Sequence, residues 1–322
     1  MYSPDPADLT SRPPVFLGHP PRPTQRAQDA VVAAIGNTPL VPLARIAGDL
    51  GFELWGKAEH LNPTGSVKDR TARGIVVDAL DSGLISPGRT LMDASSGNTA
   101  VAYAMLGARL GFPVEIILPS NAHRSRVDRI RAFGARVVFT DPGEGTDGAQ
   151  REARRRAREF PDRYFYPDQY NNPSNPRAHY ATTGPEIWRQ TSGRLSHFVA
   201  GVGTGGTISG VGRFLKEKNP TIQVVGVEPL GPMHGIEGLK HIPTALRPST
   251  YDDRLVDETV RVETEDALAM RVRLAREEGL TVGASAGAAV WAAVAVGKAH
   301  PGAFVVTILP DGGHDMPEED PS

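Results

Sequence analysis

Short apolar runs alternate with segments of helical period along most of this 322-residue chain. Runs of strand character lie at 91–94, 114–119, 136–140, 197–201, 223–229, 259–262 and 304–310. Helical patterns lie between them, for example at 98–111, 148–160 and 264–279. Such alternation predicts parallel sheets that are covered by helices on both faces. A break in the series near residue 150 predicts two α/β domains, 29–150 and 151–322, with a cleft between them.

The composition predicts a large folded core and argues against two classes of partner. The chain is 39% hydrophobic with a formal net charge of -2, which does not favour nucleic acid or an anionic membrane. No apolar stretch approaches the length of a bilayer span, and the N-terminus lacks a signal-peptide pattern, so we expect a cytoplasmic protein. Residues 1–28 contain seven prolines and predict an irregular arm.

The cysteine and histidine content argues against thiol chemistry and against a catalytic metal site. The absence of cysteine excludes disulfides, thiolate metal sites and a thiol nucleophile. The nine histidines are mostly scattered singly, without the HExxH spacing of a zinc enzyme, so we expect no catalytic metal.

Four stretches carry unusual polar residues at expected helix starts, where α/β proteins bind ligands. They are NPTGSVKDRT (62–71), ASSGNTA (94–100), GVGTGGT (201–207) and VGASAGAA (282–289). Lys68 in the first of them lies in the first turn of a predicted helix, where the partial positive charge of the helix end disfavours a lysine. Its position therefore indicates a chemical role, although a surface lysine beside Asp69 is the simplest alternative for this residue taken alone.

The glycine-rich turn at 201–207 has three interpretations. Gly201, Gly203 and Gly206 satisfy G-x-G-x-x-G, and Glu228 follows at the distance of a dinucleotide-binding acidic residue. A turn that serves only close helix packing is the second interpretation. Thr204 and Thr207 add two hydroxyls that can surround a single phosphate, so we favour a phosphate site. A phosphate site, a lysine and a polar residue at a further helix start together indicate pyridoxal phosphate.

Six segments in the same order resemble the cysteine synthase and cystathionine β-synthase family of fold-type II pyridoxal-phosphate enzymes. They lie at 35–43, 62–72, 95–100, 168–188, 201–210 and 283–288. The resemblance runs from about residue 30 to about residue 313. It implies two three-layer α/β domains with mostly parallel sheets, an active site in the cleft between them, and a homodimer. It also implies β-replacement on O-acetylserine or O-phosphoserine by sulfide or a sulfur donor, through an α-aminoacrylate, to give L-cysteine.

The resemblance implies roles for individual residues. Lys68 would form the Schiff base and act as acid and base at the substrate α-carbon, Asn98 would bind the cofactor ring hydroxyl, and Ser285 would face the pyridine nitrogen. Five residues would hold the cofactor phosphate: Gly203, Thr204, Gly205, Gly206 and Thr207. Five would contact the substrate: Ser95, Ser96, Thr99, Gln169 and Gly235. A neutral serine at the pyridine nitrogen makes a weaker electron sink than a carboxylate does, which favours β-elimination over transamination.

Several features leave the substrate open. Ala100 adds a methyl group where the family usually has glycine, and Lys240 and His241 stand where many acetylserine enzymes have small or apolar residues. The two basic residues suit a phosphate leaving group or a surface lid. A cystathionine β-synthase-like or other β-substituted alanine synthase, a serine dehydratase or racemase, an NAD-binding protein and a non-catalytic relative are the alternatives. A serine acetyltransferase and a sulfur-carrier protein are the candidate protein partners.

Overall fold

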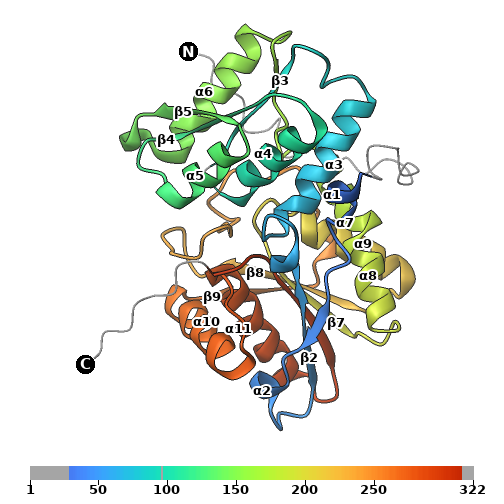
Figure 1. Cartoon of the computed structure of the whole chain (residues 1–322). Helices are drawn as coiled ribbons and strands as arrows, with labels where there is room; N and C mark the ends of the chain where they lie inside the picture. The colour runs from blue at the N-terminus through green and yellow to red at the C-terminus, as the bar shows by residue number, and fades with distance from the viewer. Residues whose placement is uncertain (1–28, 96, 314–322) are drawn as a thin grey trace.

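Two β-sheets lie one above the other in the computed structural model, which describes residues 29–95 and 97–313 (Figure 1). The larger sheet has the order β1-β2-β10-β7-β8-β9, and the smaller has the order β5-β4-β3-β6. The larger sheet contains β1 (Leu40–Pro42), β2 (Glu53–Ala58), β7 (His197–Gly201), β8 (Gln223–Pro229), β9 (Glu258–Val262) and β10 (Phe304–Leu309). The smaller contains β3 (Thr90–Ala94), β4 (Val114–Pro119), β5 (Arg136–Thr140) and β6 (Tyr164–Phe165). Every strand pair is parallel except β1 with β2.

Helices cover both faces of each sheet. They are α1 (Ala30–Ala33), α2 (Ala44–Ala47), α3 (Lys68–Asp81), α4 (Asn98–Leu110), α5 (Arg124–Ala132), α6 (Gly145–Glu159), α7 (Ser174–Ala181), α8 (Thr183–Gln190), α9 (Gly206–Lys218), α10 (Thr264–Glu278) and α11 (Ala284–Ala299). Short 3-10 turns lie at Glu59–Leu61, Pro142–Glu144 and Asp253–Leu255. The core of the larger sheet packs on α10 and α11 on one face and on α8 and α9 on the other. The smaller sheet packs on α3, α4 and α5 on one face and on α6 on the other.

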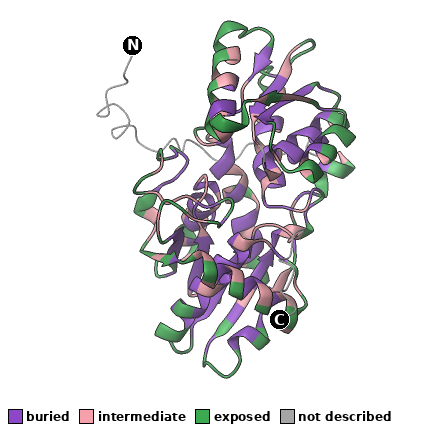
Figure 2. Ribbon diagram, turned by 90° about the vertical axis from the view of Figure 1, so that its left-hand side faces the viewer, coloured by how far each residue is buried: buried purple, intermediate pink, exposed green. Residues whose placement is uncertain are grey.

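The near-continuous apolar strands follow from this layering. Successive side chains of a strand point to opposite faces of the sheet. Leu91 and Ile116 accordingly belong to the core beneath α3 and α4, whereas their neighbours Met92 and Ile117 pack beneath α6. Side chains on both faces of the sheet are therefore buried, and buried residues concentrate along the strands and the inner helix faces (Figure 2). The two three-layer domains and the mostly parallel sheets confirm the predicted fold class.

The predicted domain boundary near residue 150 is wrong, because it does not follow the sheets. The strands β1 and β2 belong to the larger sheet although they precede the smaller one in sequence, and β6 joins the smaller sheet at 164–165. Helix α6 runs through the predicted boundary. The parallel pairing of β2 with β10 joins segments about 250 residues apart, and no local pattern reveals such a pairing.

Two expectations fall outside the described residues, namely the irregular arm at 1–28 and the role of Ser96. Among the residues that are described, we find no helix with both the length and the apolar character needed to cross a bilayer.

A buried group of charges joins the two domains at the start of α3. The Arg70 guanidinium donates to Glu59 Oε2 at 2.7 Å and to Glu186 Oε1 at 2.7 Å. Lys57 Nζ lies 2.7 Å from Glu186 Oε2. Although burial alone raises the pKa of a carboxyl, the hydrogen bonds and charge of Arg70 hold the pKa of Glu186 at about 2. We call Lys57, Glu59, Arg70 and Glu186 the interdomain charge cluster.

Substitution of Arg70 tests the weight of this cluster. We expect Arg70→Ala to lower the free energy of unfolding by about 3–5 kcal/mol, because the buried Glu59 loses its ion-pair partner and Glu186 keeps only Lys57. Arg155→Ala is the matched control, since Arg155 pairs with Glu152 and Glu159 on the exposed face of α6 and should cost less than about 1 kcal/mol. Urea unfolding of the three proteins measures both values, and equal losses for the two variants would contradict the assignment.

Candidate active site

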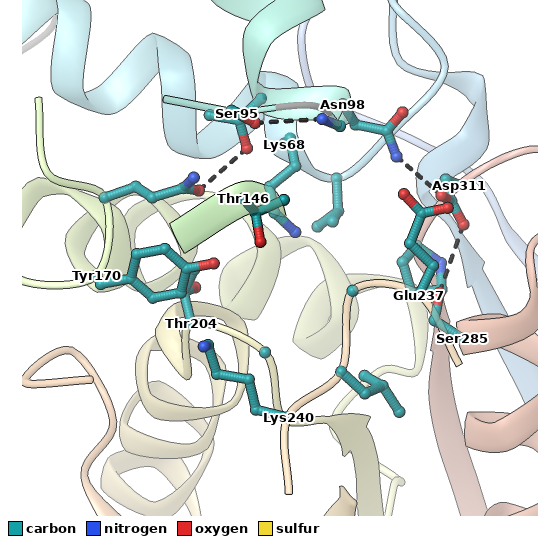
Figure 3. A pocket seen from close by; sticks show the side chains of 18 of the residues that line it. Lys68, Ser95, Asn98, Thr146, Tyr170, Thr204, Glu237, Lys240, Ser285 and Asp311 are labelled. Atoms are coloured by element: carbon teal, nitrogen blue, oxygen red, sulfur yellow. Dashed lines mark hydrogen bonds between the residues drawn. The ribbon is translucent and has the colours of Figure 1, made fainter. Parts of the chain in front are cut away.

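A pocket of about 340 Å³ lies between the two sheets, at the carboxyl ends of strands from both. Its volume is in the range of small-ligand sites in proteins. Strand β3 leads into the loop of Ser95, β7 into the glycine-rich turn, and β10 into Asp311, and all three loops line the pocket. Lys68 projects into it from α3 (Figure 3). The strand ends of both sheets thus converge on one cavity, as the sequence predicts.

The residues around Lys68 explain its placement. Helix α3 begins at Lys68, and the amide N–H of Lys68 donates to Ser66 Oγ at 3.2 Å. Asp69 accepts from the Thr64 amide at 2.7 Å and also from the Thr64 hydroxyl, which folds the preceding turn back onto the helix. Arg70 anchors the same turn in the interdomain charge cluster. The helix start is therefore held by Asp69 and Arg70, which leaves the Lys68 side chain to face the pocket.

The environment of the Lys68 amine favours its neutral form. Burial lowers the pKa of Lys68, and the charge of Asp311 opposes that effect without reversing it. A neutral amine is the nucleophile that adds to an aldehyde, so this lysine is prepared for imine formation.

The loop after β3 and the start of α4 form one wall. Ser95, Asn98 and Thr99 line the pocket, and Thr99 Oγ donates to Gln169 Oε1 at 3.0 Å across it. Gln169 is held in place by a turn in which Asp168 has a φ of 43°, a left-handed conformation that is uncommon outside glycine. The structure therefore brings together Ser95, Thr99 and Gln169, three of the residues that the resemblance assigned to the substrate.

The glycine-rich turn forms the opposite wall. Gly203, Thr204, Gly205 and Thr207 line the pocket. Gly205 has a φ of 80°, and a Cβ there would come 2.4 Å from Cβ of Tyr251. Backbone N–H groups at the start of the 13-residue helix α9 suit an anion.

Two residues behind the turn fix its position. Gly206 opens α9 against Asn175, and a Cβ on Gly206 would lie 2.0 Å from Asn175 Oδ1. Asn175 Nδ2 in turn donates to Thr204 Oγ at 3.0 Å. Thr207 Oγ lies 3.3 Å from Nε2 of the buried His179. The glycines thus allow the turn to pack closely against Asn175 and Tyr251. Without glycine side chains in the way, backbone N–H groups and the threonine hydroxyls can face the pocket.

Ser285 and Asp311 form the remaining side of the pocket. Ser285 lies in the first turn of α11, and its Oγ is 3.4 Å from Asp311 Oδ1. Asp311 Oδ2 accepts a hydrogen bond of 2.8 Å from Asn98 Nδ2 (Figure 3). No sequence motif pointed to Asp311. The available indication was its position directly after the apolar run 304–310, since polar residues at strand ends face ligands in α/β folds.

Two residues in the substrate-side motifs do not line the pocket. Gly235 is exposed and does not line the pocket, and its N–H donates to Thr264 Oγ at 3.0 Å. Ala100, which stands where the family usually has glycine, is fully buried in the core beside α3. A sequence motif does not reveal which way each of its residues faces, and the substrate contact of Gly235 stays a prediction.

The pocket is lined instead by the segment 237–240, which the chain places opposite α5. Glu237 Oε1 and Oε2 accept hydrogen bonds of 2.5 and 2.7 Å from Arg126, so an ion pair connects the two domains at the pocket. Lys240 Nζ lies 4.9 Å from the ring centre of Tyr170, and both residues line the pocket. These charged and aromatic groups add a polar side to the cavity.

The residues present fit pyridoxal phosphate. The partly buried amine of Lys68 suits the aldehyde of the cofactor. The N–H and hydroxyl donors at the start of α9 suit its phosphate, and Ser285 and Asn98 suit its pyridine ring. The dinucleotide interpretation fits less well, because Glu228 lies within β8, is 5% exposed and does not line this pocket.

Comparison with known proteins agrees with the geometry. Residues 31–311 match a family model described as pyridoxal-phosphate dependent enzyme. A cysteine synthase from Aquifex aeolicus (strain VF5) is 49% identical over 304 residues, covering 92% of this chain and 93% of that protein. A cysteine synthase B from Salmonella typhimurium is 44% identical over 279 residues, covering 87% and 91%. The crystal structure of O-acetylserine sulfhydrylase isoform 3 from Entamoeba histolytica superimposes with a TM-score of 0.84 at 34% identity, covering 92% of each chain.

The buried His179 behind the glycine-rich turn makes stability depend on pH. Burial lowers the pKa of His179 to about 3, whereas an unfolded histidine titrates near 6.5. As the pH falls from about 6.5 toward 3, the unfolded chain binds a proton that the folded protein does not. This residue alone therefore lowers the free energy of unfolding by about 1.4 kcal/mol per pH unit.

Urea unfolding at pH 6.5, 5.5 and 4.5 measures this slope. We expect His179→Asn to flatten it relative to the unsubstituted protein, while the exposed-site control His123→Asn keeps it unchanged. Identical slopes for all three proteins would show that His179 does not titrate as described.

Proposed function

The chain belongs to the pyridoxal-phosphate dependent enzymes, and we propose that it makes L-cysteine by β-replacement on an activated L-serine. The observation that carries this proposal is the convergence of Lys68, the Ser95–Thr99 loop and the glycine-rich turn on one pocket. Two relatives that match this chain over most of their length are named cysteine synthases, which supports the same reaction. The protein is on this basis a transferase of the cysteine synthase type with pyridoxal phosphate as its cofactor.

We assign the cofactor contacts from the lining of the pocket. Lys68 Nζ would bond to the cofactor aldehyde, Asn98 would donate to the ring oxygen, and Ser285 would face the ring nitrogen. The N–H groups and hydroxyls of 203–207 would hold the phosphate. When bound, pyridoxal phosphate supplies an electron sink through which the substrate loses its α-proton and its β-substituent.

The protein residues then bind the substrate and move its protons. Ser95, Thr99 and Gln169 hold the substrate carboxylate and fix the α-carbon near Lys68. Lys68 Nζ would take the α-proton, and burial, which lowers the pKa of Lys68, favours the neutral amine that this step needs. The ester group would leave the β-carbon as acetate or phosphate, sulfide or a sulfur donor would add at the same carbon, and Lys68 Nζ would return the proton to the α-carbon.

O-acetylserine is the first candidate substrate, because one of the similar solved structures is an O-acetylserine sulfhydrylase. O-phosphoserine is the second, and Lys240 favours it, since a cation at the pocket attracts a phosphate dianion. His241 gives no comparable support, because it does not line the pocket and its Nδ1 is 2.8 Å from Thr244 Oγ.

We propose that the protein works as a homodimer in the cytoplasm, with small-molecule substrates. The family resemblance is the basis for the dimer and for the candidate partners, a serine acetyltransferase or a sulfur-carrier protein. Light scattering of the purified protein measures its oligomeric state, and a monomer at micromolar concentration would contradict the first part of this assignment.

Loss of Lys68 tests the chemistry. We expect the purified protein to show a visible absorbance band with pyridoxal phosphate, and Lys68→Ala to lose that band. Cysteine formation from O-acetylserine and sulfide should fall by about 100-fold or more in the same variant, because the general acid and base is gone. Lys298→Ala, at an exposed position near the end of α11, is the control and should leave both unchanged. An unchanged band and rate in Lys68→Ala would refute the proposed function.

Substitution of Lys240 decides between the two esters. If O-phosphoserine is the substrate, Lys240→Ala should raise KM for O-phosphoserine by roughly tenfold or more, because a charge-assisted contact is lost. KM for O-acetylserine should change little. The neighbouring variant His241→Ala serves as control. Equal KM values for O-phosphoserine in Lys240→Ala and the unsubstituted protein would eliminate a phosphate role for Lys240.

A further inference from the structure

The segment 310–313, directly after β10, connects two of the loops that line the pocket. The Val67 amide donates to the Pro310 carbonyl at 2.7 Å, and the Gly312 amide donates to Gly65 at 3.3 Å. On the other side, the Gly283 amide donates to the Asp311 carbonyl at 3.1 Å. The backbone that precedes Lys68 and the backbone that precedes Ser285 are therefore both paired with this short segment.

The side chain of Asp311 extends the same connection to a third loop. Its Oδ2 accepts the 2.8 Å hydrogen bond from Asn98 Nδ2, at the start of α4, and its Oδ1 lies 3.4 Å from Ser285 Oγ. The carboxylate is closely packed, because a Cβ built on Gly283 would come 2.3 Å from Oδ1. Figure 3 shows Asp311 between Asn98 and Ser285, with the amide nitrogen of Asn98 turned toward it.

An asparagine side chain can present either its oxygen or its nitrogen to a neighbour, and the two orientations have nearly the same shape. An ionised carboxylate only accepts hydrogen bonds, so it selects the orientation in which the amide nitrogen faces it. The amide nitrogen carries two N–H groups. When one is bound to Asp311, the other remains available for an acceptor inside the pocket.

We propose that Asp311 is a positioning residue that fixes the amide of Asn98 so that its second N–H meets the cofactor ring oxygen. This proposal rests on the proposed function, because it assumes that pyridoxal phosphate occupies the pocket. Asp311 acts through Asn98 and does not itself contact the reacting atoms. Ser285 lies beside the other oxygen of the same carboxylate, so Asp311 contacts both residues that are expected to meet the cofactor ring.

A double-mutant cycle on cofactor binding tests the proposal. The dissociation constant for pyridoxal phosphate is measured by absorbance titration of Asp311→Ala, Asn98→Ala, the double variant and the unsubstituted protein. A hydrogen bond to a charged group contributes roughly tenfold to hundredfold to an equilibrium constant, and we expect a loss of that size for each single variant. Because Asp311 acts through Asn98, the double variant should bind no more than about threefold more weakly than the weaker single variant.

Further variants separate positioning from folding. Asp311→Asn keeps an oxygen acceptor for Asn98 and should recover most of the affinity that Asp311→Ala loses. Asp252→Ala removes a carboxylate that pairs with Arg254 outside the pocket and should bind the cofactor normally. Urea unfolding of the cofactor-free variants shows whether each remains folded, and the folded Asp311→Asn variant keeps the test valid if Asp311→Ala does not fold.

Three results would overturn the assignment. They are normal binding by Asp311→Ala, losses that multiply in the double variant, and a loss in Asp311→Asn as large as that in Asp311→Ala. In each case the unsubstituted protein would still bind the cofactor and form cysteine, so the proposed function would stand. Failure of the unsubstituted protein to bind pyridoxal phosphate would instead refute the proposed function itself.

Discussion

The position of Lys68 depends on the buried ion pairs of Arg70, two residues further along the same helix. Arg70 belongs to α3 in the smaller domain, whereas its partners Glu59 and Glu186 lie in the 3-10 turn after β2 and in α8 of the larger one. Burying such charges costs free energy unless each finds its partner, so the cluster forms only when the domains are correctly docked. The same contacts that join the domains therefore place the lysine at the cavity between them.

This arrangement divides three tasks among three consecutive residues. Lys68 faces the pocket, Asp69 holds the preceding turn through Thr64, and Arg70 holds the domains together. Burial raises the pKa of Asp69 to about 6, against the opposing hydrogen bonds from Thr64. A lysine at a helix start is unfavourable for the helix by itself. The contacts of Asp69 with Thr64 and of Arg70 with Glu59 fix the position of this helix start in spite of that cost.

Much of the fold could be predicted from the sequence because local patterns determine it. The apolar runs at 114–119 and 136–140 correspond to strands with the same bounds, and the helix starts near residues 98, 206 and 285 carry the expected polar loops. The strands β2 and β6 were not predicted, since their parallel pairing depends on distant segments. The strand β1 was not predicted either, because its three residues are too few to show an alternating pattern. Asp311 escaped notice for a related reason. Its importance comes from contacts with Asn98 and Gly283, which lie far from it in the chain.

The pairing of β2 with β10 also determines the order in which the protein can be assembled during synthesis. Domains generally fold as units while the chain emerges from the ribosome. All four strands of the smaller sheet are complete by residue 165, whereas β2 must wait for residues 304–309 before it gains its parallel neighbour. The segment 310–313, which joins the loops of Lys68 and Ser285, emerges later still. The pocket consequently forms only after residues 304–313 have been made, and a nascent chain cannot hold the cofactor before then.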